Sequence, residues 1–365
     1  MNMPADTKID IKKIAIPIFS VLVSFILGGI IIKMMGLSPS TAFKALMQGG
    51  IGNINALGET FVKATPLVFT ALSYAFAYKA GLINIGAEGQ LYMGGFLATL
   101  VGTNFQGLPM YIHLPLAIIA AFIGGGLWGL VVAWLKVRFN ANEIITTVML
   151  NYIAMNWISY LVTGPMKAPP GNYPQSKDIL STALLPNILP GSRLHLGLLL
   201  AVLMLIFYYI FFKKTKTGYE TRIVGRNRKA ADYAGMKSKK LSLLIMFIAG
   251  GVAGLAGASE ILGIQGRMIE GFSPGYGFDG IAVALLGLNS SFGIGLSAIF
   301  FGFLRSGGNM MQMLAQVPVS VISIITGLVI IFVIAGQAIS NNRIAGLQKI
   351  IDLFKRSEPN NGKHS

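Results

Sequence analysis

The chain has no cysteine, which excludes disulfide bonds, thiolate-bound metals and a cysteine nucleophile. It has only three histidines, His113, His195 and His364, and none of them has a second ligand at the spacing of a metal site. We therefore expect no bound metal. The lack of cysteine does not assign a redox compartment, because thiols can be absent from proteins of either kind.

Motifs of two common enzyme classes are also missing. The chain has no G-x-x-x-x-G-K-[ST] phosphate loop and no H-E-x-x-H zinc motif. Ser306 and Lys240 are the residue types of a Ser-Lys dyad, but nothing in the sequence places them together. The sequence therefore predicts neither an enzyme nor a protein with a cofactor.

Charge is scarce, since only 12% of the residues are charged, whereas 54% are hydrophobic and the mean hydropathy is +0.67. This is more apolar surface than one soluble core could bury, so lipid is the expected surroundings. The apolar runs are continuous and do not alternate with a period of two, which favours helices over a membrane barrel. We expect membrane spans near 14–32, 61–79, 86–102, 115–135, 143–163, 195–212 and 241–262.

The region 278–338 is apolar too, but polar, glycine-containing stretches at 287–295 and 305–312 interrupt it. We expect two short helices here, followed by one full span near 317–338, which brings the total to about ten. The first span is too long for a signal-peptide core and no A-x-A-like cleavage site follows it, so we expect it to be retained. The sequence predicts an all-α polytopic membrane protein with a single transmembrane domain over 1–365, some of whose helices are short or broken.

Acidic residues are few, 13 against 29 lysines and arginines, and the basic residues cluster beside the spans. The loop 213–240 alone holds ten basic and two acidic residues. The positive-inside rule places this loop and both termini in the cytoplasm and the nearly balanced connection 164–194 outside. A basic surface is also the footprint of a nucleic-acid binder. The position of the charges beside spans instead indicates contact with anionic membrane lipid, so we expect no nucleic-acid partner.

Polar residues within the apolar segments indicate a transport function. An ionisable group at membrane depth costs a few kcal/mol, so such groups usually face a bundle interior or an aqueous path. Amides in membrane helices also serve simply to hold helices together, and this alternative stays open for each amide. The candidates for a substrate pathway or a helix break are Asn84, Glu88, Gln90, Asn151 and Glu260.

The stretch GLINIGAEGQ (81–90) holds three glycines, which weaken a helix, and places Asn84 and Glu88 four residues apart. Non-helical backbone at membrane depth needs hydrogen-bond partners. We predict that Glu88 caps or braces a break between the second and third spans, close to the transport path and to the cytoplasmic side. The alternative is a solvated inner loop.

Four segments resemble permease subunits of ABC importers of the branched-chain amino acid, ribose and nucleoside superfamily. They are AGLINIGAEGQLYMGG (80–95), NEIITTVMLNYIA (142–154), GRNRKAADYAGM (225–236) and GFDGIAVALLG (277–287). From the second span onward the chain is similar to the longer of the two permeases of bacterial nucleoside importers that work with a basic-membrane-protein lipoprotein. Simple-sugar permeases share much of the pattern.

The resemblance implies a permease that forms half of an ATP-driven pathway in the bacterial cytoplasmic membrane. The partners it implies are a second permease subunit in a heterodimer, an ATP-binding cassette ATPase and an external substrate-binding lipoprotein. It also implies that a short helix of the cytoplasmic coupling loop 213–240 docks into the ATPase. The alternative is that this loop only orients the chain. The expected coupling residues are Gly225, Asn227, Ala230, Ala231 and Gly235.

The competing hypothesis is an ion-coupled secondary transporter of a small polar solute, with Glu88 or Glu260 as the coupling carboxylate. Such transporters are built from inverted repeats with paired broken helices. The chain contains no convincing second copy of GLINIGAEGQ. Glycine pairs at GxxxG spacing, Gly125 with Gly129 and Gly250 with Gly254, predict close helix packing.

Overall fold

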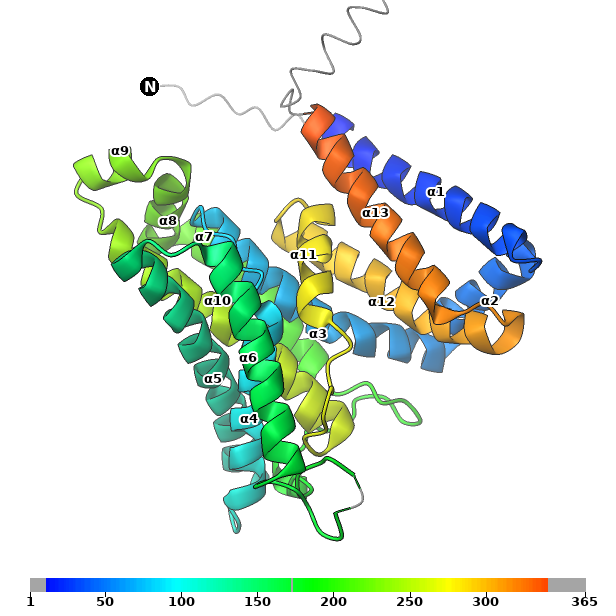
Figure 1. Cartoon of the computed structure of the whole chain (residues 1–365), viewed down its shortest axis with the longest axis horizontal. Coiled ribbons are helices and arrows are strands. Elements are labelled where there is room, and N and C mark those ends of the chain that lie inside the picture. The colour runs from blue at the N-terminus through cyan, green and yellow to red at the C-terminus, as the bar shows by residue number, and fades with distance from the viewer. Residues whose placement is uncertain (1–10, 172, 341–365) are drawn as a thin grey trace, which may run out of the picture. The chain divides into compact units, whose positions relative to one another are not determined.

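The computed structural model describes residues 11–171 and 173–340, and helices dominate this part of the chain (Figure 1). The described residues belong to two compact units. One unit holds α1 (Ile11–Met34) and α13 (Val319–Ser340), which pack together where Gly28 meets Ile325. The other unit runs from Ser40 to Gln316. The predicted all-α polytopic membrane fold is confirmed, whereas the single domain over 1–365 stays a prediction.

All ten predicted apolar segments are helical. Five helices are long and apolar enough to cross a membrane, namely α3, α5, α6, α7, and α10 with the π-helical turn that extends it. Within the larger unit the predicted helices are α3 (Ile54–Lys79), α4 (Ala87–Asn104), α5 (Met110–Phe139), α6 (Glu143–Thr163), α7 (Gly197–Lys214), α10 (Ser238–Glu260), α11 (Tyr276–Leu286) and α12 (Ser291–Ala315). The loop 213–240, where the resemblance implies one short helix, holds two, α8 (Lys216–Arg226) and α9 (Arg228–Tyr233). Elements absent from the prediction are α2 (Pro39–Ile51), a 3-10 turn (Ser181–Ala183) and the π turn (Ile261–Gln265).

Asparagine side chains fix the starts of two spanning helices. The Asn53 side chain accepts a hydrogen bond from the Ala56 amide at 2.8 Å, and the Asn142 side chain accepts one from the Ile144 amide at 2.9 Å. The first four amides of a helix have no partner inside the helix, so each cap satisfies one of these donors. The caps explain why α3 and α6 begin where they do.

One predicted interruption is present and the other is wrong. At 287–295 the chain does break, because Leu288 and Asn289 adopt left-handed backbone angles between α11 and α12. The stretch 305–312, however, lies within an unbroken α12. Its small residues serve packing instead: Ser306 donates a hydrogen bond to the Gly49 carbonyl of α2 at 2.8 Å.

The glycine pairs predicted to allow close packing meet each other across the contact between α5 and α10. A methyl group on Gly125 would touch the backbone of Gly250 and Gly254, and one on Gly129 would touch Gly250 and the Met246 carbonyl. Small residues at GxxxG spacing permit this approach of two backbones. Helix α4 also contacts α5 and α10, so these three helices pack against one another in the larger unit (Figure 1).

We expect Gly250→Val to lose folded protein. Its side chain would overlap the Gly125 carbonyl, a backbone atom that cannot rotate away, and overpacking of this kind costs about 3 kcal/mol or more. Thermal denaturation in detergent measures the loss. Gly327→Val is the matched control, because Gly327 also lies in an apolar helix but has open space around its Cα. Equal melting temperatures for the two variants would contradict the proposed packing.

The two ends of the larger unit differ in character (Figure 1). Helices α8 and α9 lie at one end of the α5–α10 pair, and the connection 164–196 lies at the opposite end. The assignment of the basic loop to the cytoplasm stays a prediction. The termini assigned to the cytoplasm, 1–10 and 341–365, lie outside the described residues.

Candidate functional site

The turn that joins α3 to α4 contains a closed network of buried amides. Asn84 donates to Gln90 Oε1 at 2.9 Å and to Ser73 Oγ at 3.0 Å, and Gln90 donates back to Asn84 Oδ1 at 3.1 Å. Asn84 Oδ1 also accepts from the Gly86 amide at 3.0 Å. Asn84 and Gln90 are both 0% exposed. The network thus supplies the partners that a break in the helix requires at membrane depth.

Asn151 ties α6 to the same turn. Its Oδ1 accepts from the Gly89 amide at 2.8 Å and its Nδ2 donates to the Ile85 carbonyl at 3.0 Å. The Gly89 amide lies in the first turn of α4, where a helix has free amides, and Ile85 lies in the turn before it. The three amides Asn84, Gln90 and Asn151 therefore hold helices together in this structure.

Glu88 lies in the first turn of α4, and it is 1% exposed rather than solvated. Its Oε2 accepts a hydrogen bond of 2.6 Å from the Gly277 amide, in the first turn of α11. A carboxylate is well suited to this place, since a helix N-terminus carries free amides and a partial positive charge. The brace thus joins two helix starts that are 189 residues apart in the chain. It does not cap the break itself.

We expect Glu88→Gln to be tolerated better than Glu88→Leu. Glutamine keeps an oxygen that can accept from Gly277, whereas leucine leaves a buried amide without a partner, at about 1–3 kcal/mol. Melting temperature in detergent and expression level measure the difference. Equal values for the two variants would contradict the brace. Loss of transport in Glu88→Gln at full stability would instead show that the charge itself is needed.

Glu260 is the last residue of α10 and is 2% exposed. Its carboxylate lies beside the Tyr276 side chain, yet Glu260 Oε1 and the Tyr276 hydroxyl lack a hydrogen-bond partner among the described residues. The π turn begins at the next residue, and π turns frequently occur at functional sites. Positive charges from Lys63, Arg193 and Arg305 act on Glu260. It is thus a buried carboxylate with neighbouring cations.

A charged pair lies close to Glu260. Arg305 of α12 contacts Asp279 of α11 at 2.5 Å, and its guanidinium lies 4.7 Å from the centre of the Tyr276 ring. The side chains of Arg305 and Asp279 are 24% and 25% exposed. Arg193 lies in the connection 164–196 and donates hydrogen bonds to Glu59 of α3, which raise the pKa of Arg193. The partly exposed pair of Arg305 and Asp279, between α11 and the middle of α12, favours an aqueous neighbourhood over lipid.

Residues 271–275, GFSPG, match the G-x-S-x-G pattern of hydrolases, which sequence reasoning missed. In those enzymes the serine stands at a turn between a strand and a helix. Here the segment follows a π turn, and Ser273 Oγ accepts from the Tyr276 amide at 3.3 Å. The serine therefore supports the start of α11.

The coupling loop contains two short helices with defined caps. The Asn227 side chain accepts from the Ala230 amide at 3.0 Å and so begins α9, and Gly235 follows the helix with a φ of +79°. Ala230 is exposed, but Ala231 is 0% exposed and packs in a small core with Val224 and Leu241. The Ala231 side chain therefore faces the loop's own interior and not its outer surface.

The loop touches the GLINIGAEGQ turn directly. A methyl group built on Gly225 of α8 would lie on the Lys79 carbonyl and 2.9 Å from the Gly81 amide, and one built on Gly81 would lie 3.0 Å from Gly225. Only glycine permits this approach, because Gly81 also has a φ of +72°. The loop 213–240 thus rests on the segment that leads to Asn84 and Glu88.

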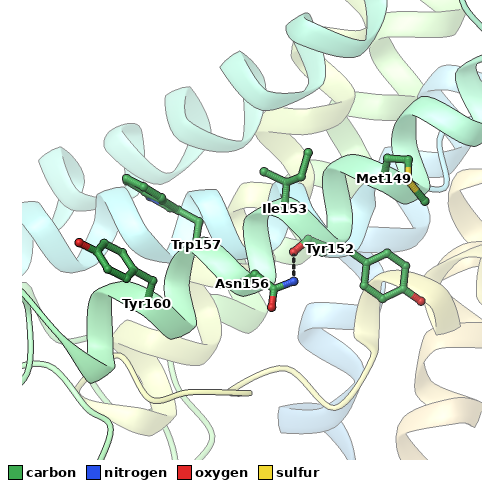
Figure 2. A pocket seen from close by; sticks show the side chains of 6 residues that line it. All are labelled: Met149, Tyr152, Ile153, Asn156, Trp157 and Tyr160. Carbon is green, nitrogen blue, oxygen red and sulfur yellow. Dashed lines mark hydrogen bonds between the residues drawn. The ribbon is translucent and has the colours of Figure 1, made fainter.

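One side of α6 carries a row of side chains from this helix alone, without an opposing wall among the described residues (Figure 2). It is mostly aromatic and aliphatic, with one amide at its centre. That amide, Asn156, is a polar residue within a predicted span, and it donates to the Tyr152 carbonyl at 2.8 Å. We call this surface the α6 face. Its residues are Met149, Tyr152, Ile153, Asn156, Trp157 and Tyr160.

Comparison with known proteins gives a family and several relatives. Residues 56–334 match the family described as branched-chain amino acid transport system, permease component. The chain is 39% identical over 333 residues to the guanosine ABC transporter permease protein NupP of Bacillus subtilis. The aligned region covers 90% of this chain and 95% of NupP. It is 37% identical over 338 residues to the glucose ABC transporter permease protein TsgB13 of Haloferax volcanii, and the aligned region covers 90% of this chain and 89% of TsgB13. It is 32% identical over 331 residues to the nucleoside ABC transporter permease protein NupB of Lactococcus lactis, and the aligned region covers 88% of this chain and 91% of NupB.

The relatives come in pairs of permeases. Bacillus subtilis also has NupQ, 30% identical to this chain over 258 residues, and Lactococcus lactis has NupC, 25% identical over 256 residues. Each covers 68% of this chain. No solved structure matches the chain.

Proposed function

Because the chain belongs to the family of branched-chain amino acid transport system permease components, we propose that it is one permease subunit of an ATP-driven ABC importer. It forms half of the translocation pathway. Since the chain has no phosphate loop, ATP is hydrolysed on a separate ATPase subunit.

One contact carries this proposal: Gly225 of the coupling loop rests on Gly81 at the start of the α3–α4 turn. From this turn, Asn151 leads to α6 and Glu88 leads to α11. A force applied to α8 and α9 is therefore delivered to the starts of α4 and α11 and to the middle of α6. An importer driven by an ATPase at the cytoplasmic surface needs such a connection.

The substrate we propose is a nucleoside. Two of the relatives are named for guanosine and for nucleosides, and one is named for glucose. A nucleoside is neutral and carries an aromatic base, so a pathway of aromatic rings and amides suits it better than a charged clamp.

The proposed complex contains a second permease, as the paired relatives suggest, and an ATPase bound at α8 and α9. An external lipoprotein delivers the substrate. The complex lies in the bacterial cytoplasmic membrane in contact with lipid, both termini of this chain are inside, and no nucleic acid takes part. The ion-coupled alternative gains no support from the three relatives, which are all named as ABC permeases.

Uptake of labelled guanosine, uridine, ribose and glucose into cells with and without this chain tests the proposal. We expect nucleoside uptake to depend on the chain and to stop when ATP is depleted. If uptake survives ATP depletion and stops when the ion gradients collapse, the chain is a secondary transporter. If only the sugars respond, the nucleoside assignment is wrong.

A further inference from the structure

Helix α8 lies across the ends of two apolar helices. A methyl group built on Gly218, near the start of α8, would lie on the Phe211 carbonyl of α7. One built on Gly225, near the end of α8, would lie on the carbonyl of Lys79, the last residue of α3. Both α3 and α7 are long and apolar enough to cross a membrane, and α7 ends at Lys214. Helix α8 therefore lies at the level where the hydrocarbon ends.

Exposed tyrosines mark the same level. Tyr78 of α3, Tyr209 of α7 and Tyr219 of α8 are each about half exposed. Tyrosine gathers where a membrane helix passes from hydrocarbon to lipid headgroups, because its ring is apolar and its hydroxyl is polar. The Lys213 ammonium lies 5.0 Å from the centre of the Tyr209 ring, so this level also carries positive charge. The junction of α3, α7 and α8 thus lies at headgroup depth.

Three cations meet where α8 rests on α3. Arg222 and Arg226 are one turn apart on the side of α8 that holds Gly225, and their charges repel that of Lys79. Among the described residues these three side chains have no ion pair and no hydrogen bond, and the one acidic residue of α8, Glu220, instead contacts Lys216 at 3.8 Å. Like charges held together in this way require an anion to offset their repulsion.

An apolar surface adjoins these cations. Phe207 of α7 is exposed, and its ring lies 6.2 Å from the ring of Phe76, which precedes Lys79 by about one turn of α3. Leu203 and Ile210 are exposed on the same side of α7 and extend this surface along the helix. The junction therefore offers a place for a negative charge and, beside it, a surface that suits hydrocarbon.

We propose that the junction of α3, α7 and α8 is a binding site for an anionic phospholipid. The phosphate lies among Lys79, Arg222 and Arg226, and an acyl chain lies along Phe207 and the outer side of α7. By offsetting the repulsion between the cations, the lipid stabilises the contact of Gly225 with the end of α3. A free phosphate or an acidic side chain of a partner protein would match the charges but would leave the adjoining apolar surface uncovered.

Arg222→Gln combined with Arg226→Gln tests the site in the purified full chain in detergent. We expect phosphatidylglycerol, but not phosphatidylcholine, to raise the melting temperature of the wild type. Each cation near a membrane surface contributes about fivefold to the binding of an anionic lipid, so the double variant should bind phosphatidylglycerol about 25-fold more weakly. Lys229→Gln combined with Lys239→Gln is the matched control, because it removes the same charge from exposed positions of the loop 213–240 outside the junction. It should leave the affinity unchanged.

Glycerol 3-phosphate separates a lipid site from a site for free phosphate, because it carries the phosphate without the acyl chains. We expect it to leave the melting temperature unchanged at concentrations at which phosphatidylglycerol raises it. Equal stabilisation by the two compounds would overturn the inference, and so would equal affinity of the two double variants for phosphatidylglycerol. If Arg222→Gln with Arg226→Gln keeps that affinity but loses the ATPase from purified complexes, the inference is also overturned, because the cations then contact acidic side chains of that subunit.

Discussion

Replacing Gly225 by valine is expected to lower substrate uptake at least tenfold while the ATPase still binds. The valine side chain would overlap the Lys79 carbonyl and crowd the Gly81 amide, so α8 could no longer rest on the α3–α4 turn. The outer surface of α9 would be unchanged. Movements of the ATPase would then reach α8 without reaching Asn84 and Glu88, and substrate would no longer stimulate ATP hydrolysis.

Three measurements on the same purified complex check this expectation: uptake in proteoliposomes, ATP hydrolysis with and without substrate, and the amount of bound ATPase. Lys216→Val is the control, since it adds the same side chain at an exposed position on α8, where Lys216 has only a 3.8 Å contact with Glu220. Gly225→Ala should give an intermediate loss. Normal substrate-stimulated hydrolysis and uptake in Gly225→Val would show that coupling takes another route.

The positions of the helices could be predicted because the membrane imposes a simple requirement on sequence. A span needs about 20 apolar residues, and ten such segments or fragments of them were visible. Short helices such as α8 and α9 carry no such signal, since the residues 216–233 are mostly polar. The stretch 305–312 was misread for a related reason. Glycine both weakens a helix and permits close packing, and only the presence of α2 beside Ser306 and its neighbours decides between the two.

The candidate site was predictable in its residues but not in its connections. A carboxylate and amides in an apolar stretch must have partners, so selecting Glu88 and Asn84 needed only the sequence. That Glu88 reaches Gly277 could not be seen, because the two are 189 residues apart and no local period relates them. Asn156 could be selected as a polar residue within an apolar segment, but the sequence does not show that it lies on an exposed face of α6.

The coupling loop shows the same limit at the scale of single residues. Ala230 and Ala231 are equivalent in a sequence, yet one is exposed and the other lies in the core with Val224 and Leu241. A bulky substitution at Ala231 would disturb the loop itself and could not report on docking. The exposed residue with the largest apolar surface on α9 is Tyr233, which is 94% exposed.

Tyr233→Glu is therefore expected to reduce ATPase binding about thirtyfold and to abolish uptake with it. A tyrosine that becomes buried in an interface commonly contributes about 2 kcal/mol or more to binding, and a carboxylate in its place would be left without a partner. Folding should be unaffected, because Tyr233 makes no ring contact or hydrogen bond with its side chain among the described residues. The melting temperature of the isolated chain should accordingly equal that of the wild type.

Tyr173→Glu is the matched control for this substitution. Tyr173 is 70% exposed and lies in the connection 164–196, at the end of the bundle opposite to α9, so the same change of charge and size there should leave ATPase binding intact (Figure 1). Co-purification of the ATPase with each variant, followed by uptake in proteoliposomes, separates the possibilities. If the ATPase binds Tyr233→Glu as well as it binds Tyr173→Glu, the loop 213–240 orients the chain and the ATPase docks elsewhere. If only Tyr233→Glu loses the ATPase, α9 is the docking helix and Gly225 is the contact that passes its movement to the α3–α4 turn.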